Sequence, residues 1–139
     1  MKRVFIDSSV FFSAAYSEKG ASRELLLMGA RGEVILVLSS LVLEETRRNL
    51  SEVSPDLAML FDLIVDAIPF ELIQPTKDEV VLAAKMVEIK DAPILAAARK
   101  AGADLLVTLD KKHLLGKPEL VKFVGMPIVV PGEAITHHL

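Results

Sequence analysis

RVFIDSS, at residues 3–9, is an apolar run that ends in a carboxylate, Asp7, and continues into two serines. DLLVTLD, at residues 104–110, repeats this pattern, because a second apolar run ends in a hydroxyl residue and the carboxylate Asp110. Both runs have the composition of buried strands. In an open α/β sheet the carboxyl ends of parallel strands lie along one edge, where ligands bind. We therefore expect Asp7 and Asp110 to converge at a ligand-binding edge.

The rest of the chain alternates between predicted strands and predicted helices. Further strands are expected at residues 34–38, 70–73 and 126–130. Apolar periodicity and capping signals predict helices at residues 11–16, 22–30, 40–50, 56–67, 80–87 and 91–102, with a break at residues 18–20. This alternation predicts an α/β fold, a three-layer α/β/α sandwich with a mostly parallel central sheet of four or five strands.

The composition is typical of one globular domain, which we expect to span residues 1–139. No apolar run approaches the roughly 20 residues of a membrane helix, so we expect a cytoplasmic protein. The absence of cysteine leaves oxygen or imidazole as the ligands of any metal, and the three histidines are too scattered to indicate a site. A net charge of −3 argues against a simple nucleic-acid binder. It is compatible with an enzyme whose acidic pocket holds divalent cations.

Two more carboxylates, Glu45 and Asp91, are expected near helix starts, and each acid also has an ordinary structural explanation. Asp91 precedes Ala92 and Pro93 and would serve as a helix N-cap. Glu45 would interact favourably with the helix dipole, and the adjacent Glu44 is an alternative ligand. Asp110 would begin a turn.

If the four acids converge, two carboxylates about 4 Å apart repel each other by roughly 4 kcal/mol at an effective dielectric of 20, so the cluster needs cations or protons. Mg²⁺ or Mn²⁺ fits oxygen ligands best, and the pattern predicts a metal-dependent nuclease.

Four segments of the chain resemble the PIN-domain nucleases. They read FIDSSV at residues 5–10, SLVLEE at 40–45 running to Leu50, KDAPILAAA at 90–98 and GADLLVTLD at 102–110. The resemblance assigns Asp7, Glu45, Asp91 and Asp110 to the catalytic, metal-binding acidic cluster. It favours Glu45 over Glu44, and it gives Ser9 and Thr108 the role of orienting the carboxylates. Residues 111–113 read KKH where many relatives carry a further acid, so a second metal is expected to bind weakly.

The predicted reaction is in-line attack of a metal-activated water on a phosphodiester, leaving 5′-phosphate ends. The resemblance implies an endoribonuclease acting on single-stranded RNA, and the small relatives imply a homodimeric toxin silenced by a cognate antitoxin. Candidate phosphate contacts are Arg47, Lys111 and Lys112. The apolar helix residues that would form either core or a dimer face are Leu25, Leu26, Leu57, Leu60 and Phe61.

Three other functions fit parts of the same pattern. A phosphohydrolase with an aspartyl nucleophile would also place Asp7 after the first strand, but the second acid that it wants two residues later is Ser9 here. A receiver-like module would need an acidic pair beside Asp7 and a suitably placed lysine, and neither is evident. A non-catalytic PIN-like module that binds RNA or assists assembly differs from the nuclease in activity alone.

Overall fold

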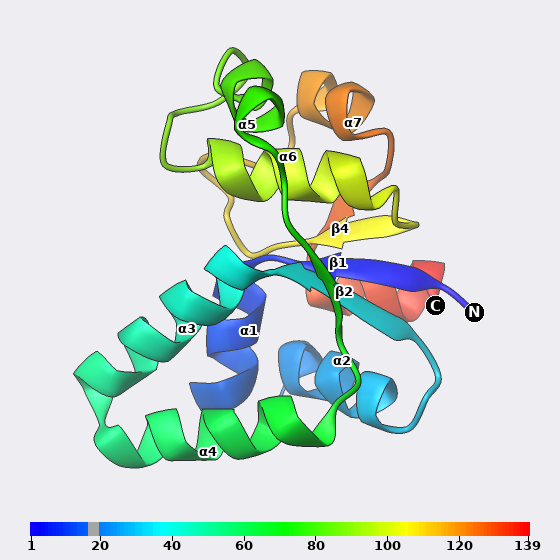
Figure 1. The fold of residues 1–139 in the computed structure, drawn as a ribbon. Helices are drawn as coiled ribbons and strands as arrows, with labels where there is room; N and C mark the ends of the chain where they lie inside the picture. Colours follow the sequence, from blue (N-terminus) through cyan, green and yellow to red (C-terminus); the bar gives the residue numbers. More distant parts are fainter. Residues whose placement is uncertain (17–19) are drawn as a thin grey trace.

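The computed structural model describes residues 1–16 and 20–139. In these residues five parallel strands form one sheet in the order β3-β2-β1-β4-β5 (Figure 1). The strands are β1 (Arg3–Ile6), β2 (Ile35–Ser39), β3 (Glu71–Ile73), β4 (Leu105–Val107) and β5 (Ile128–Val129). The expected α/β fold is confirmed, and the sheet is parallel throughout.

Helices cover both faces of the sheet (Figure 1). One layer holds α5 (Lys77–Ala83), α6 (Ala92–Ala101) and α7 (Pro118–Val124). The opposite layer holds α1 (Ser8–Tyr16), α2 (Ala21–Ala30), α3 (Ser40–Val53) and α4 (Pro55–Ala67). The C-terminal α8 (Pro131–Glu133) contacts α2 and continues into the π-helical segment η1 (Ala134–His138). This arrangement is the predicted three-layer sandwich.

The strand order reverses direction at β1, because β2 and β3 follow on one side of it while β4 and β5 lie on the other. Ile6 of β1 pairs with Val107 of β4, so the next residues, Asp7 and Thr108, leave the sheet side by side. The Asp7 amide donates to the Val107 carbonyl at 3.1 Å, which extends the pairing to the acid itself. A reversal of this kind opens a crevice at the carboxyl ends of the strands.

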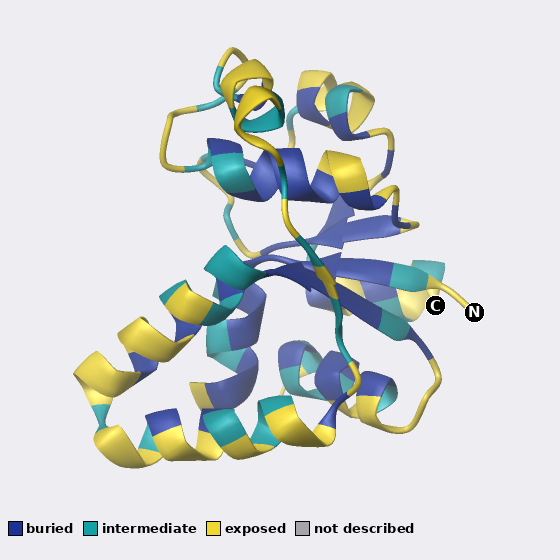
Figure 2. Cartoon of the chain, in the orientation of Figure 1, coloured by how far each residue is buried: buried dark blue, intermediate teal, exposed yellow. Residues whose placement is uncertain are grey.

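The central strands are buried on both faces, as continuous apolar runs in a covered parallel sheet should be (Figure 2). Below the sheet, the Phe11 ring of α1 packs edge to face against Phe61 of α4 and Phe70, with centroid distances of 4.8 and 5.3 Å. Leu25, Leu26 and Phe61, which were candidates for a dimer face, therefore belong to the core. Leu60 is 41% exposed.

Several element boundaries differ from the sequence predictions. α1 begins at Ser8 and not at residue 11, so the helix starts immediately after the first acid. α7 was not predicted. Of the expected break at residues 18–20, only Gly20 lies within the described residues, where its φ of 113° suits glycine. In the described part of the chain, no helix combines the length and the apolarity that crossing a membrane requires.

Candidate metal and active site

Asp7 is the buried centre of the candidate site, with 5% of its surface exposed. Its Oδ1 accepts a hydrogen bond from the Ser8 amide at 2.7 Å. Its Oδ2 accepts from the Ser9 hydroxyl at 2.9 Å and from the Thr108 hydroxyl at 2.6 Å. These three hydrogen bonds fix the orientation of the carboxylate. The carboxylate at the end of β1 is thus held in place before any ligand arrives.

Thr108 and Ser9 connect Asp7 to the end of β4. The fully buried Thr108 hydroxyl accepts from the Asp110 amide at 3.0 Å while donating to Asp7. The Ser9 hydroxyl accepts from the Leu109 amide at 3.0 Å. The two hydroxyl residues therefore fix the chain that carries Asp110 relative to Asp7.

Asp110 begins a turn, which is the structural role that the sequence indicated for it. Its Oδ1 accepts from the Lys112 amide at 3.1 Å and from the His113 amide at 2.9 Å. Its Oδ2 lies 3.2 Å from Nδ1 of His113. The turn leaves Asp110 at a cavity that Asp7 also lines. The structural role and a ligand role are therefore compatible.

Asp7, Glu45, Asp91 and Asp110, all predicted from the sequence, line one cavity of about 430 Å³ together with Ser9. Glu44 lines a different cavity, of about 270 Å³, together with Gln74 and Pro93. The structure thus brings four acids from β1, α3, the start of α6 and the end of β4 to one place.

Asp91 does not act as the helix N-cap that its position before Pro93 suggested. Its backbone is already helical, at φ −93° and ψ −14°, and its side chain makes no capping hydrogen bond with the described residues. A capping side chain requires an extended backbone at its own residue, so this interpretation was wrong. A turn in which the Asp91 amide donates to the Glu88 carbonyl at 2.9 Å sets the backbone instead.

One oxygen of the Asp91 carboxylate lacks a hydrogen-bond partner among the described residues. This oxygen, Oδ2, is buried, although the side chain as a whole is 16% exposed. Burial raises the pKa of the Asp91 carboxyl above its ordinary value, and the charges of Asp110 and Glu88 raise it further against the opposing effects of His113 and Lys90. An orphaned buried oxygen is costly unless a proton or a cation reaches it.

The three predicted phosphate contacts, unlike the four acids, do not lie in one place. Arg47 lies on α3 with its guanidinium paired to Asp62 of α4, at 3.1 and 3.2 Å, and it does not line the acidic cavity. Lys111 is exposed in the turn after β4. Lys112 lines a neighbouring cavity of about 550 Å³. The structure therefore brings Lys112, and not Arg47, toward the acids.

Sequence reasoning missed two residues beside the acids, His113 and Glu88. His113 contacts Asp110 and lies 3.9 Å from Asp91, while Glu88 lies 3.8 Å from the other nitrogen of the His113 ring. Each stands three residues from a predicted acid, His113 after Asp110 and Glu88 before Asp91. That spacing was the available signal, since within a turn it brings side chains to one side.

The donor set of the acidic cavity fits Mg²⁺ or Mn²⁺. All four predicted ligands offer carboxylate oxygen, which these ions prefer. The Asp91 carboxylate, whose Oδ2 lacks a hydrogen-bond partner among the described residues, provides a structural reason for a cation beside Asp91. A cation would offset the energetic cost of burying the Asp91 carboxylate, and it would offset the repulsion between Asp91 and Asp110.

Comparisons with known proteins agree with this fold. The PIN domain family model matches residues 3–112, which contain all four acids. The structure of PAE2754 from Pyrobaculum aerophilum superposes with a TM-score of 0.66 at 19% identity, covering 96% of this chain and 93% of that one.

Two further solved structures share the fold at lower identity. VapBC2 from Rickettsia felis, bound to a DNA fragment from their promoter, gives a TM-score of 0.62 at 14% identity and covers 91% of this chain and 96% of that one. FitAcB from Neisseria gonorrhoeae gives 0.60 at 14% identity, with 98% and 99% covered. The search of curated protein sequences gives no match. Because the family model spans most of the chain, from β1 through the turn that follows β4, the protein belongs to the PIN domain family.

Proposed function

We propose that the protein is a divalent-metal-dependent endoribonuclease that hydrolyses phosphodiester bonds of single-stranded RNA. The observation that carries this proposal is the meeting of four carboxylates in one cavity at the reversal of strand order, one of them with a buried, unpartnered oxygen. PIN domains are typically metal-dependent nucleases, and the segment that the family model matches includes all four acids. The preference for RNA rests on the family resemblance.

The proposed ligands of Mg²⁺ or Mn²⁺ are Asp7, Glu45, Asp91 and Asp110. A bound cation supplies a Lewis acid that neutralises phosphate charge and lowers the pKa of water. Ser9 and Thr108 hold the Asp7 carboxylate in a fixed orientation, so little reorganisation is needed when a cation binds. Lys112, in the adjoining cavity, is positioned to contact a phosphate of the bound strand.

Cleavage of a mixed single-stranded RNA in Mn²⁺, Mg²⁺ or EDTA tests the proposal. Asp7→Asn and Asp91→Asn should each reduce the rate by at least about 100-fold, because each removes a ligand charge from the same cavity. Asp66→Asn, an exposed change on α4 outside the cavity, is the matched control and should cleave like the wild type. Products should carry 5′-phosphates.

The alternatives give different results in the same assay. Cleavage that survives EDTA, or that survives both substitutions, would exclude the metal mechanism at these acids. RNA binding without cleavage in every cation would favour the non-catalytic PIN-like module. A different metal-dependent phosphohydrolase would hydrolyse small phosphate esters and leave RNA intact.

We also propose a biological setting, a toxin held inactive by a cognate antitoxin, which rests on the resemblance of this chain to small PIN-domain toxins. Expression of the chain alone should arrest growth, and co-expression of the adjacent open reading frame should relieve the arrest. Asp7→Asn should abolish the arrest without altering the amount of protein. A homodimer remains a prediction, which light scattering of the purified chain tests directly.

A further inference from the structure

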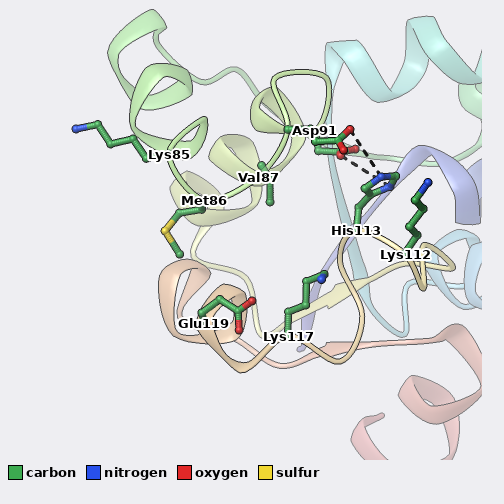
Figure 3. Close-up of a pocket in the computed structure, with 9 residues that line it drawn as sticks. Lys85, Met86, Val87, Asp91, Lys112, His113, Lys117 and Glu119 are labelled. Carbon is green, nitrogen blue, oxygen red and sulfur yellow. Dashed lines mark ion pairs between the residues drawn. The ribbon is translucent and has the colours of Figure 1, made fainter.

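His113 lies between three carboxylates that come from two separated turns. Its Nδ1 is 3.2 Å from Asp110 Oδ2 and 3.9 Å from Asp91 Oδ2, and its Nε2 is 3.8 Å from Glu88 Oε2. The ring is 18% exposed. Figure 3 shows the imidazole pointing toward Asp91 across the cavity that separates the α5–α6 turn from the turn after β4.

The hydrogen bond to Asp110 determines which ring nitrogen is free. At 3.2 Å, Nδ1–H donates to the Asp110 carboxylate, so Nε2 carries the lone pair in the neutral ring. Histidines that bind metals almost always donate their second ring nitrogen to a carboxylate or carbonyl in this way. His113 is therefore oriented with its free nitrogen toward Glu88.

The distances around His113 suit an ion better than direct contacts. The free Nε2 lies 3.8 Å from Glu88 Oε2, whereas the 3.9 Å separation from Asp91 Oδ2 is measured from Nδ1, and both exceed the hydrogen-bond range. Two ligands of a tetrahedral ion, each about 2.1 Å from it, lie about 3.4 Å apart. One ligand atom each from Glu88, Asp91 and His113 fall within 4.8 Å of one another. A rotation of the Asp91 side chain toward Nε2, with smaller movements of Glu88 and His113, would bring all three onto one cation.

The orphaned oxygen of Asp91 is an independent indication of a ligand. Asp91 Oδ2 is the atom that faces His113, and it is buried without a hydrogen-bond partner among the described residues. Asp91 also lines both neighbouring cavities, the acidic one with Asp7 and the larger one with His113. A carboxylate placed between two cavities has one oxygen available for each.

We propose that Glu88, Asp91 and His113 form a second cation site, which shares Asp91 with the acidic cavity and takes a first-row transition ion such as Zn²⁺ or Co²⁺. An imidazole with two carboxylates suits these ions better than Mg²⁺, which prefers all-oxygen ligands. The second site goes beyond the proposed nuclease function, because it would bind metal whether or not the chain cleaves RNA.

Titration of the metal-free protein with Co²⁺, followed by visible absorption and by NMR of the imidazole groups, tests the site. His137→Gln and His138→Gln are introduced in every sample, because the C-terminal imidazoles would also take up Co²⁺. The His113 signals should shift or broaden with the first equivalent. Zn²⁺ should compete for the site, and Mg²⁺ should compete poorly.

Four variants locate the ion. His113→Gln and Glu88→Gln should each weaken Co²⁺ binding by about tenfold or more, and Glu88 is an exposed side chain whose change leaves the core intact. Glu119→Gln, in the same cavity but outside the cluster, should retain wild-type affinity. Asp7→Asn, confined to the acidic cavity, should retain it as well. Unchanged affinity in His113→Gln, or loss in Asp7→Asn alone, would overturn the proposal.

Discussion

Thr108 is the residue that ties the two strand-end carboxylates together. Its hydroxyl donates to Asp7 and accepts from the Asp110 amide, in a position with no exposed surface. Thr108→Val preserves the shape, but it removes one of the two hydrogen bonds to Asp7 Oδ2 and leaves the Asp110 amide without its acceptor. We expect a loss of about 1–3 kcal/mol in the free energy of unfolding, measured by urea denaturation.

Thr108→Ser is the control, because serine retains the hydroxyl and loses a methyl group. Its cost should be near the roughly 0.8 kcal/mol of one buried methylene-sized group, and its Mn²⁺ affinity should stay near that of the wild type. If valine and serine were equally destabilising, packing and not the hydrogen bonds would explain the role of Thr108.

Asp91 should make stability depend on pH. Because burial raises its pKa in the folded state, the folded protein binds this proton more tightly than the unfolded chain does. Stability therefore falls as the pH rises from the unfolded pKa of about 3.9 through the raised folded value. We expect Asp91→Asn to melt at a higher temperature than the wild type at pH 7 in EDTA, with the difference shrinking toward pH 4.

Thermal unfolding in EDTA at both pH values measures this effect, with Asp66→Asn as the exposed control. Asp66→Asn should track the wild type throughout. A lower melting temperature for Asp91→Asn at pH 7 would mean that the charged carboxylate stabilises the metal-free fold, contrary to its burial and missing partner.

At the residue scale, the sequence predicted which acids would share a cavity better than it predicted their neighbours. Asp7 and Asp110 were identifiable because strand ends in a parallel sheet meet at one edge. His113 and Glu88 were missed because their proximity depends on two turns that are 25 residues apart in the chain, at positions 88 and 113. The N-cap expectation for Asp91 failed for a similar reason, since the preceding turn sets its backbone.

At the scale of elements, the close approach of α2 to β2 depends on Gly29. A Cβ built at this position would lie 2.4 Å from Cδ1 and 2.8 Å from Cγ of the buried Leu36. Gly29→Ala should therefore overpack the helix against the sheet and lower the free energy of unfolding by about 1–3 kcal/mol. This outcome opposes the usual gain of glycine-to-alanine changes in helices.

Gly132→Ala is the matched control for Gly29→Ala. Gly132 lies in α8 and does not adopt a positive φ, and a Cβ added there would meet no described atom within 4 Å. Its change should alter stability by less than about 1 kcal/mol. Chemical denaturation of the two variants side by side separates overpacking from helix propensity.

Elements with strong local signals were predicted, and those that depend on tertiary packing were not. The Ser54-Pro55 cap and the Thr76–Glu79 capping box correctly marked where α4 and α5 begin, although α5 ends at Ala83 and not at residue 87 as predicted. The Thr76 and Glu79 side chains make both reciprocal hydrogen bonds. α7 spans seven residues and lacks a side-chain cap among the described residues. A helix this short depends on burial, here of Leu120 and Val124, and leaves little periodic signal.

At the scale of the whole molecule, charge and topology act together. A chain of net charge −3 concentrates four acids at the reversal of its strand order, where the ends of two central strands meet α3 and the start of α6. Without cations, the four carboxylates repel one another, and they also repel a polyanion such as RNA. Cation binding should therefore stabilise the global fold as well as enable RNA to approach.

Divalent cations should raise the unfolding free energy of the wild type by about 2.7 kcal/mol when free Mn²⁺ is 100-fold above its dissociation constant. Asp7→Asn should lose most of this gain, because it removes the most buried carboxylate of the acidic cavity, whereas Asp66→Asn should keep it. Urea denaturation at graded Mn²⁺ concentrations, reversed with EDTA, provides the measurement. An equal gain in the wild type and Asp7→Asn, lost instead in His113→Gln, would place the stabilising ion between Glu88 and His113 and leave the acidic cavity without a measurable cation.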